Sequence, residues 1–452
     1  MTIRTRFLML GLSLVVVLAA TALDGRGLLA QARARWQSQD ATSLLTVANP
    51  RASDIERQVT ALQERLRQSP DDPRLLTALG GAYLQRARDT GDVSYYARAE
   101  LALRHAVDRQ PDNVDALTQL GVLALARHQF HAARNLAEQA QALNPDRALI
   151  YGVLGDALVE LGEYPQAVAI VQRMVDLRPD LSSYARVSYL RELHGDIPGA
   201  VDAMQRAVRA GGPAAENAAW SQTQLALLYF NQGDLVRAEA ELRATLSLHG
   251  GYIPAQVALA RVHAARGEWE PALLLLRHAV EVMPLPEYAI LLGDVYRAAD
   301  RPDEAAAQDA LVRAMAQLQR TGGMAVDLEM ALFEADHGGE PTAVMAQARQ
   351  AYLDRPSIHG ADALAWALYR AGRLDEARLY SQQALRLGTR DALLHYHAGM
   401  IALAAGDRVA ARQSLDAALS INPYFSLSHA AEARAALNQL GAAAPAPQES
   451  GS

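Results

Sequence analysis

The chain has 452 residues, a formal net charge of −7, and hydrophobic side chains at half of its positions. It contains no Cys, which excludes thiolate nucleophiles, disulfides, Cys-ligated metals and a cysteine-linked lipid anchor. All 43 basic residues other than His are Arg. Without Lys the chain lacks the lysine of a P-loop, of a protein kinase and of Schiff-base chemistry.

The N-terminal segment combines a basic flank with an apolar run. Arg4 and Arg6 precede the uncharged residues 7–23, and Ala20-Thr21-Ala22 has the small residues of a cleavage site. We expect residues 1–22 to be a cleaved signal peptide, with Leu23 as the mature N-terminus, or a retained membrane anchor, because so short a run is at the lower limit for crossing a bilayer. Either reading predicts that the rest is exported, periplasmic or otherwise extracytoplasmic.

The next two segments are a linker and a helix. Residues 23–50 have mixed polarity without a clear period and predict a linker. Residues 51–69 predict a helix with Ile55, Val59, Leu62 and Leu66 on one face. That face either covers the end of the helical array that follows or pairs with another chain, and we expect the capping role, since arrays need covered ends.

From residue 72 the sequence repeats with a period of 34 residues, which predicts stacked helix–turn–helix units. Small residues at fixed positions allow two helices to approach closely, and Pro after the second helix ends it. A Gly inside each turn supplies the left-handed residue that ends the first helix. The recurring set is Gly121, Ala133, Ala140 and Pro145, then Gly155, Ala167, Met174 and Pro179, then Gly399, Ala411, Ala418 and Pro423; the turn glycines are Gly162, Gly195, Gly233, Gly267, Gly372 and Gly406.

This pattern resembles the tetratricopeptide repeat family over about residues 72–425. Leu-Gly pairs such as Leu154-Gly155 stand on the first helices, and Ala, Ala and Pro follow on the second. The resemblance implies an all-α fold, a right-handed α-solenoid of about ten helix–turn–helix repeats with N- and C-terminal capping helices. We assign repeats 1–7 to residues 72–320 and repeats 8–10 to residues 321–425, with a change of pitch near 318–326. Each unit is expected to be coupled to its neighbours alone.

Beyond the repeats, residues 426–440 predict a C-terminal capping helix and residues 441–452 a disordered tail rich in Ala and Pro. Motifs for catalysis, phosphate binding and zinc are absent from the sequence. The nearest metal-like group is His395-Tyr396-His397, but residues two apart on a helix point to different faces. We therefore expect one His in the groove and one in the packing, with no metal site, no cofactor and no enzyme activity.

The first helices of the family line its concave face, and the resemblance implies a groove there for a partner peptide or helix. Trp, Tyr and Arg dominate binding hot spots, so we expect these residue types to bind the partner. Inter-repeat packing is the alternative role for the aromatic residues, and it stays open for Trp366. The family's Lys/Asn clamp for terminal carboxylates is not reproduced. The candidate residues are Trp220, Phe230, Arg261, Asp294, Arg297, Trp366, Tyr369, Arg370, Tyr396 and His397.

These features predict a non-enzymatic protein–protein interaction scaffold of the exported or cell-envelope space, with other proteins as partners and with membrane attachment through the N-terminus if the anchor is retained. Arg residues are interspersed with Asp and Glu rather than gathered on one face. Because nucleic-acid binding usually needs a basic face, we expect no nucleic acid as a partner. The alternative is a ligand-binding or enzymatic protein whose site is built in the solenoid groove.

Overall fold

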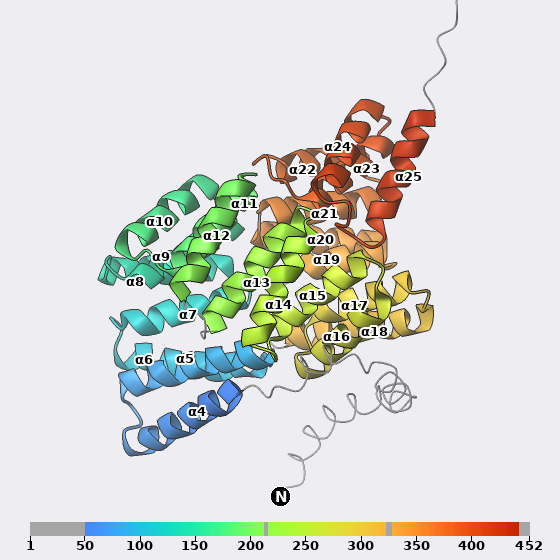
Figure 1. The fold of residues 1–452 in the computed structure, drawn as a ribbon. Coiled ribbons are helices and arrows are strands. Elements are labelled where there is room, and N and C mark those ends of the chain that lie inside the picture. The colour runs from blue at the N-terminus through green and yellow to red at the C-terminus, as the bar shows by residue number, and fades with distance from the viewer. Residues whose placement is uncertain (1–49, 212–215, 322–327, 443–452) are drawn as a thin grey trace, which may run out of the picture. The chain divides into compact units, whose positions relative to one another are not determined.

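The computed structural model describes residues 50–211, 216–321 and 328–442, and in these ranges the chain forms 22 helices and no strand (Figure 1). Ten hairpins follow one another from α5 to α24, with α4 before them and α25 after them. The all-α solenoid is therefore confirmed. The helices are α4 (Pro50–Gln68), α5 (Pro73–Thr90), α6 (Ser94–Arg109), α7 (Val114–Ala126), α8 (Phe130–Leu143), α9 (Ala148–Glu160), α10 (Tyr164–Leu177), α11 (Leu181–Leu193), α12 (Ile197–Gly211), α13 (Glu216–Asn231), α14 (Leu235–Leu248), α15 (Ile253–Ala265), α16 (Trp269–Val282), α17 (Pro286–Ala298), α18 (Pro302–Thr321), α19 (Leu328–Asp336), α20 (Pro341–Asp354), α21 (Ile358–Arg370), α22 (Leu374–Ala384), α23 (Ala392–Ala404), α24 (Arg408–Ile421) and α25 (His429–Ala442).

Several predicted segments lie outside the described residues. They are the signal peptide or anchor at 1–22, almost all of the linker at 23–50, most of the expected pitch change at 318–326, and the tail from residue 443. Within the described ranges, no helix has both the length and the apolar character needed to cross a membrane.

The recurring small residues lie where the helices of the array touch. Ala133, Ala140 and Ala167 are fully buried. A Cβ on Gly121 would lie 2.8 Å from Cγ1 of Val153, closer than real Cβ contacts come. Small residues therefore set the close approach of helices that the sequence predicted.

Each hairpin turns through a left-handed residue. Gly162 and the other five predicted turn glycines have φ between 70° and 81°. Two units without a suitable Gly use His128 and Asp300 at the same place, both with φ of 58°. The turn geometry is thus kept although a non-Gly residue in this region carries a steric cost.

The helices at the two ends pack on the array. Ile55 and Leu62 of α4 are buried in one cluster with Leu75 and Leu79 of α5. At the other end, Leu440 of α25 joins the buried cluster of α21–α24. The last helix begins at His429, three residues later than the sequence indicated, because residues 424–428 form turns instead.

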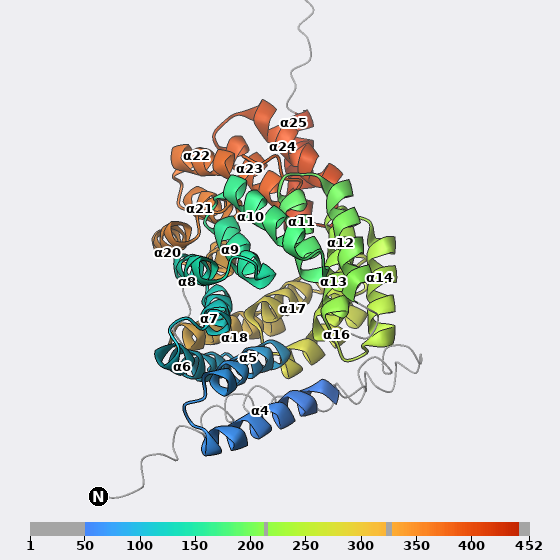
Figure 2. The same cartoon turned by 90° about the vertical axis from the view of Figure 1, so that its left-hand side faces the viewer.

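The array also contacts itself one superhelical turn later. The Tyr164 hydroxyl accepts the Ile358 N–H at 2.8 Å across 194 residues, and Asn422 Nδ2 donates to the Phe230 carbonyl at 3.0 Å across 192. Arg355 forms an ion pair with Glu160 across 195 residues. These spacings equal between five and six periods of 34 residues. The turn between α9 and α10 thus meets the start of α21, and residues of both segments share one buried cluster (Figure 2).

Two turn glycines lie where successive superhelical turns touch. A Cβ on Gly162 would lie 2.4 Å from the Pro356 carbonyl oxygen, and one on Gly195 would lie 2.4 Å from the Gly388 carbonyl oxygen. In contrast, a Cβ on Gly372 or Gly406 would meet nothing within 4 Å. We call this set of interactions, at Glu160–Gly162, Tyr164, Gly195, Phe230 and their partners, the turn-to-turn contacts. They correct the expectation of coupling between neighbouring units alone, because the superhelix is tight enough for successive turns to touch.

Candidate partner-binding cavity

The inner face of the array carries an open cavity of about 530 Å³. Its wall takes residues from the first helices of the last six units, α13, α15, α17, α19, α21 and α23, together with α25. Tyr424–Ser428, the segment before α25, closes one side, and the Asn422–Phe230 hydrogen bond fixes the start of that segment to the end of α13. The cavity therefore depends on the turn-to-turn contacts as well as on the stacking of units.

Seven of the ten predicted groove residues line this cavity. They are Phe230, Arg261, Asp294, Arg297, Trp366, Arg370 and His397. The structure brings them together because each stands on the inward side of a first helix, as the resemblance implied.

The other three are elsewhere. Trp220 is 41% exposed on α13 and does not line the cavity. Tyr369 stacks on Trp366 with ring centroids 4.8 Å apart, outside the lining. Tyr396 is fully buried, because its ring stacks on His429 at 4.8 Å and its hydroxyl donates to Glu432 at 2.5 Å. For Tyr396 the structure therefore corrects the groove assignment to a packing role.

Trp366 joins the core and the cavity wall. Its side chain is only 2% exposed, its ring stacks on His397 at 4.1 Å, and its Nε1 donates to Asp336 at 2.7 Å. Because the indole N–H is already satisfied, Trp366 offers the cavity only an apolar edge. Of the two roles that the sequence left open for Trp366, packing between units is therefore the main one.

Acidic and His side chains that the sequence reasoning omitted complete the wall. Asp336, His337, His429 and Glu432 all line the cavity. Burial lowers the pKa of His337, but hydrogen bonds to Asp294 and to the Phe333 carbonyl outweigh it and raise the pKa above its ordinary value. Burial lowers the pKa of His429, although Asp336 lies 3.6 Å away. Two of these residues belong to the predicted cap, whose inward side no repeat pattern could indicate.

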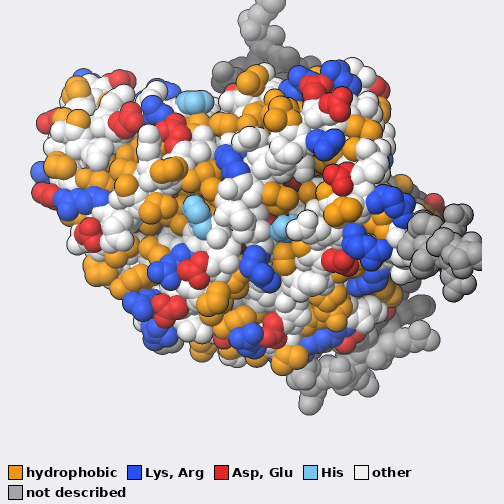
Figure 3. All heavy atoms as spheres, turned by 90° about the horizontal axis from the view of Figure 1, so that it is seen from above, with side chains coloured by type: hydrophobic (Ala, Val, Ile, Leu, Met, Phe, Trp, Pro, Cys, Tyr) orange, Lys and Arg blue, Asp and Glu red, His pale blue; other side chains and the backbone are white. Residues whose placement is uncertain are grey.

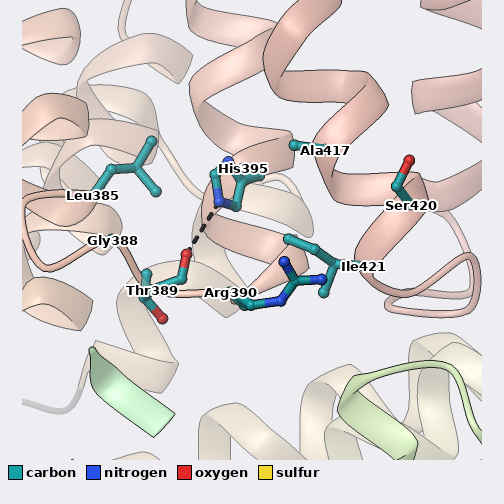
Figure 4. A pocket seen from close by; sticks show the side chains of 8 residues that line it. All are labelled: Leu385, Gly388, Thr389, Arg390, His395, Ala417, Ser420 and Ile421. Carbon is teal, nitrogen blue, oxygen red and sulfur yellow. Dashed lines mark hydrogen bonds between the residues drawn. The ribbon is translucent and has the colours of Figure 1, made fainter. Parts of the chain in front are cut away.

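The two histidines of His395-Tyr396-His397 lie on different sides of α23. His397 lines the cavity and is 1% exposed, whereas His395 lies on another side of α23 beside Thr389. Figure 4 shows His395 in a separate pocket with Arg390 and Ser420, where its Nε2 is 3.2 Å from the Thr389 carbonyl oxygen. Among the described residues, no group of three or more His, Asp or Glu side chains is placed to hold a metal ion.

Comparison with known proteins agrees with this architecture. Two family models, both described as tetratricopeptide repeat, match the chain, one at residues 124–192 and 229–295 and the other at 363–426. The chain belongs to the tetratricopeptide repeat family. No sequence among the curated proteins matches this tetratricopeptide repeat protein.

Solved structures similar to this repeat protein share little sequence with it. A human IFIT1 dimer with PPP-AAAA is 14% identical, covers 73% of this chain and 77% of its own, and has a TM-score of 0.47. Cut9 with Hcn1, from an APC/C hetero-tetramer, is 12% identical over 86% and 93% of the chains at a TM-score of 0.39. MamA is 20% identical, covers 36% of this chain and 92% of its own, and has a TM-score of 0.29.

The expectation that nucleic acid is excluded as a partner is wrong. IFIT1, one of these similar structures, was solved with PPP-AAAA, Gppp-AAAA and m7Gppp-AAAA. The expectation rested on acidic and basic side chains being interspersed, as one face shows in Figure 3. That mixture describes outer surfaces, whereas a ligand inside the array meets only the side chains that line the cavity.

Proposed function

We propose that this tetratricopeptide repeat protein is a non-enzymatic scaffold that binds a segment of a partner protein in its cavity. Repeats of this family typically serve as scaffolds for protein interactions. The observation that supports a specific site is the cavity itself, because inward residues of six successive units and of the cap meet around one space of about 530 Å³. Its wall combines apolar side chains with a few charged ones, as binding sites generally do.

A cavity-filling variant tests the site. Ala298 lines the cavity and is exposed, so Ala298→Trp puts an indole into that space at little cost to the core. Ala244 of α14 is equally exposed but lies outside the lining, and Ala244→Trp is the matched control. We expect capture of a co-purifying partner, found by affinity purification and mass spectrometry, to fall at least about tenfold with Ala298→Trp alone. Equal capture by both variants would move the partner site out of the cavity.

We further propose that the protein acts outside the cytoplasm, attached to the membrane if residues 1–22 are retained. The basic flank and the apolar run at 7–23 support this. Cell fractionation and N-terminal sequencing test it. A soluble exported protein that begins at Leu23 is expected for a cleaved signal, and an intact N-terminus in a salt-resistant membrane pellet for an anchor. Recovery of the full-length protein in the cytosol would contradict both.

A further inference from the structure

The carboxylates that line the cavity are already engaged. Asp294, Asp336 and Glu432 each accept a hydrogen bond from a neighbouring side chain. The partners are Arg297 at 2.8 Å from Asp294, Trp366 at 2.7 Å from Asp336 and Tyr396 at 2.5 Å from Glu432.

Two of the three guanidinium groups that line the cavity are not engaged in this way. Arg297 bonds Asp294 and Asp309, whereas Arg261 and Arg370 have no hydrogen bond or ion pair with any described residue. Charge-assisted bonds to carboxylate are what a guanidinium favours most. The wall therefore carries two guanidinium groups that lack a carboxylate partner among the described residues.

Arg261 is the more constrained of the two. It is partly exposed in the wall, and its guanidinium lies 5.0 Å from the centre of the Phe230 ring. Burial lowers its pKa, and the charge of Asp391, which caps the N-terminus of α23 and does not bond Arg261, opposes that lowering without cancelling it. A recessed guanidinium without an ionic partner is costly, and a bound anion would remove that cost.

A buried polar atom on the same wall is also without a partner. His397 is 1% exposed and lines the cavity; its Nδ1 is 2.9 Å from Asp362, but its Nε2 bonds no described residue. Apolar side chains of Leu332, Leu393 and Phe425 lie on the wall as well. The wall thus suits an anionic group that is carried beside apolar groups and polar backbone.

We propose that Arg261 and Arg370 together bind the side-chain carboxylate of an Asp or Glu in the partner segment, flanked by apolar residues. This rests on the proposed function and names the chemistry of its partner. The carboxylate replaces the missing ion pair of Arg261, and the guanidinium of Arg370 on α21 supplies a second donor group. A chain-terminal carboxylate could supply the same chemistry, and the peptide titration distinguishes it from a side-chain carboxylate.

Three fluorescein-labelled synthetic peptides are the probes in an anisotropy titration. One is Gly-Leu-Glu-Leu-Leu-Gly with an amidated end, the second has Gln for Glu, and the third is the Gln peptide with a free terminal carboxylate. We expect the Glu peptide to bind about tenfold more tightly than either Gln peptide. Arg261→Met and Arg370→Met should each weaken the Glu peptide about tenfold and leave the Gln peptides unchanged.

Arg237→Met is the matched control, because Arg237 also stacks on an aromatic ring, at 4.5 Å from the centre of Tyr229, but lies outside the cavity lining. It should leave all affinities unchanged. Equal binding of the Glu and Gln amides would overturn the carboxylate proposal while leaving the cavity as a partner site. Tighter binding of the free-acid Gln peptide than of the amidated Glu peptide would show that the cavity binds a chain-terminal carboxylate rather than a side chain, and would overturn the proposal on that point. Failure of every peptide, including the case where a 5′-triphosphate oligoadenylate binds instead, would overturn the proposal entirely.

Discussion

Replacing Tyr164 by Phe tests whether the turn-to-turn contacts stabilise the array. Ile358 is the first residue of α21, so no carbonyl of its own helix accepts its N–H. The Tyr164 hydroxyl accepts it at 2.8 Å, and the two residues are 2% and 0% exposed. Phe keeps the ring but leaves a buried donor unsatisfied, which costs about 1–3 kcal/mol. We expect the opening free energy of this region to fall by that amount.

Hydrogen exchange followed by mass spectrometry distinguishes this loss from an ordinary local one. With Tyr164→Phe, exchange should accelerate in α10 and also at the start of α21, 194 residues away. Tyr151→Phe is the control, because it removes the same atom from a residue that is 4% exposed and whose hydroxyl donates to the nearby Pro145 carbonyl at 2.8 Å. Its effect should stay within α8–α10. Unchanged exchange at residues 356–370 in Tyr164→Phe would refute the reasoning.

Three further predictions concern single positions. Burial, opposed by a hydrogen bond from Asn231, raises the pKa of Glu192 to about 7, so the folded state holds this proton more tightly than the unfolded chain and loses stability as the pH rises from about 4.5 through 7. In urea unfolding, Glu192→Gln should therefore be more stable than the parent at pH 8, by on the order of 2 kcal/mol, and similar to it at pH 4. Parallel pH profiles of the two proteins would contradict this. Gly162→Ala and Gly372→Ala both place Ala at φ of 70–74°, at a cost of about 1 kcal/mol each. Only the Cβ at position 162 meets a carbonyl oxygen of the next superhelical turn, so the Tm of Gly162→Ala should fall further than that of Gly372→Ala. Equal falls in Tm would argue against that contact. Ala140 is fully buried between helices, and Ala140→Leu should cost about 1–3 kcal/mol in thermal unfolding, with an unchanged Tm counting against close approach there.

The local structure of the units could be predicted from the sequence because it depends on short-range steric demands. Gly121 and Ala140 reveal where helices meet, and Gly162 reveals a left-handed turn. His128 and Asp300 were not found, since neither is a Gly, although His and Asp enter the left-handed region more readily than most other residues. The turn-to-turn contacts were not predictable, because the superhelical pitch is a sum of small rotations between units and no single motif encodes it.

The residues of the candidate site also divide into those that the sequence predicted and those that it did not. Arg261, Arg297 and Arg370 were found by their place on the first helices, which the period fixes. The position of Tyr396 in the core depends on Glu432 and His429, which come from the cap rather than from any repeat. Sequence periodicity thus identified the wall built by the units and missed the wall built by the segment that ends them.

The turn-to-turn contacts give this chain an order of assembly that an open solenoid lacks. Ribosomal synthesis completes residues 91–233 before any of their partners at 283–423 exist, so the turns at Gly162 and Gly195 begin as uncovered surface. Nearest-neighbour stacking can follow the growing chain, but contacts across 192 to 195 residues raise the contact order and form only when the later units arrive. The earlier units therefore act as the template on which the later ones settle, and the cavity, which needs the Asn422–Phe230 bond, is completed last.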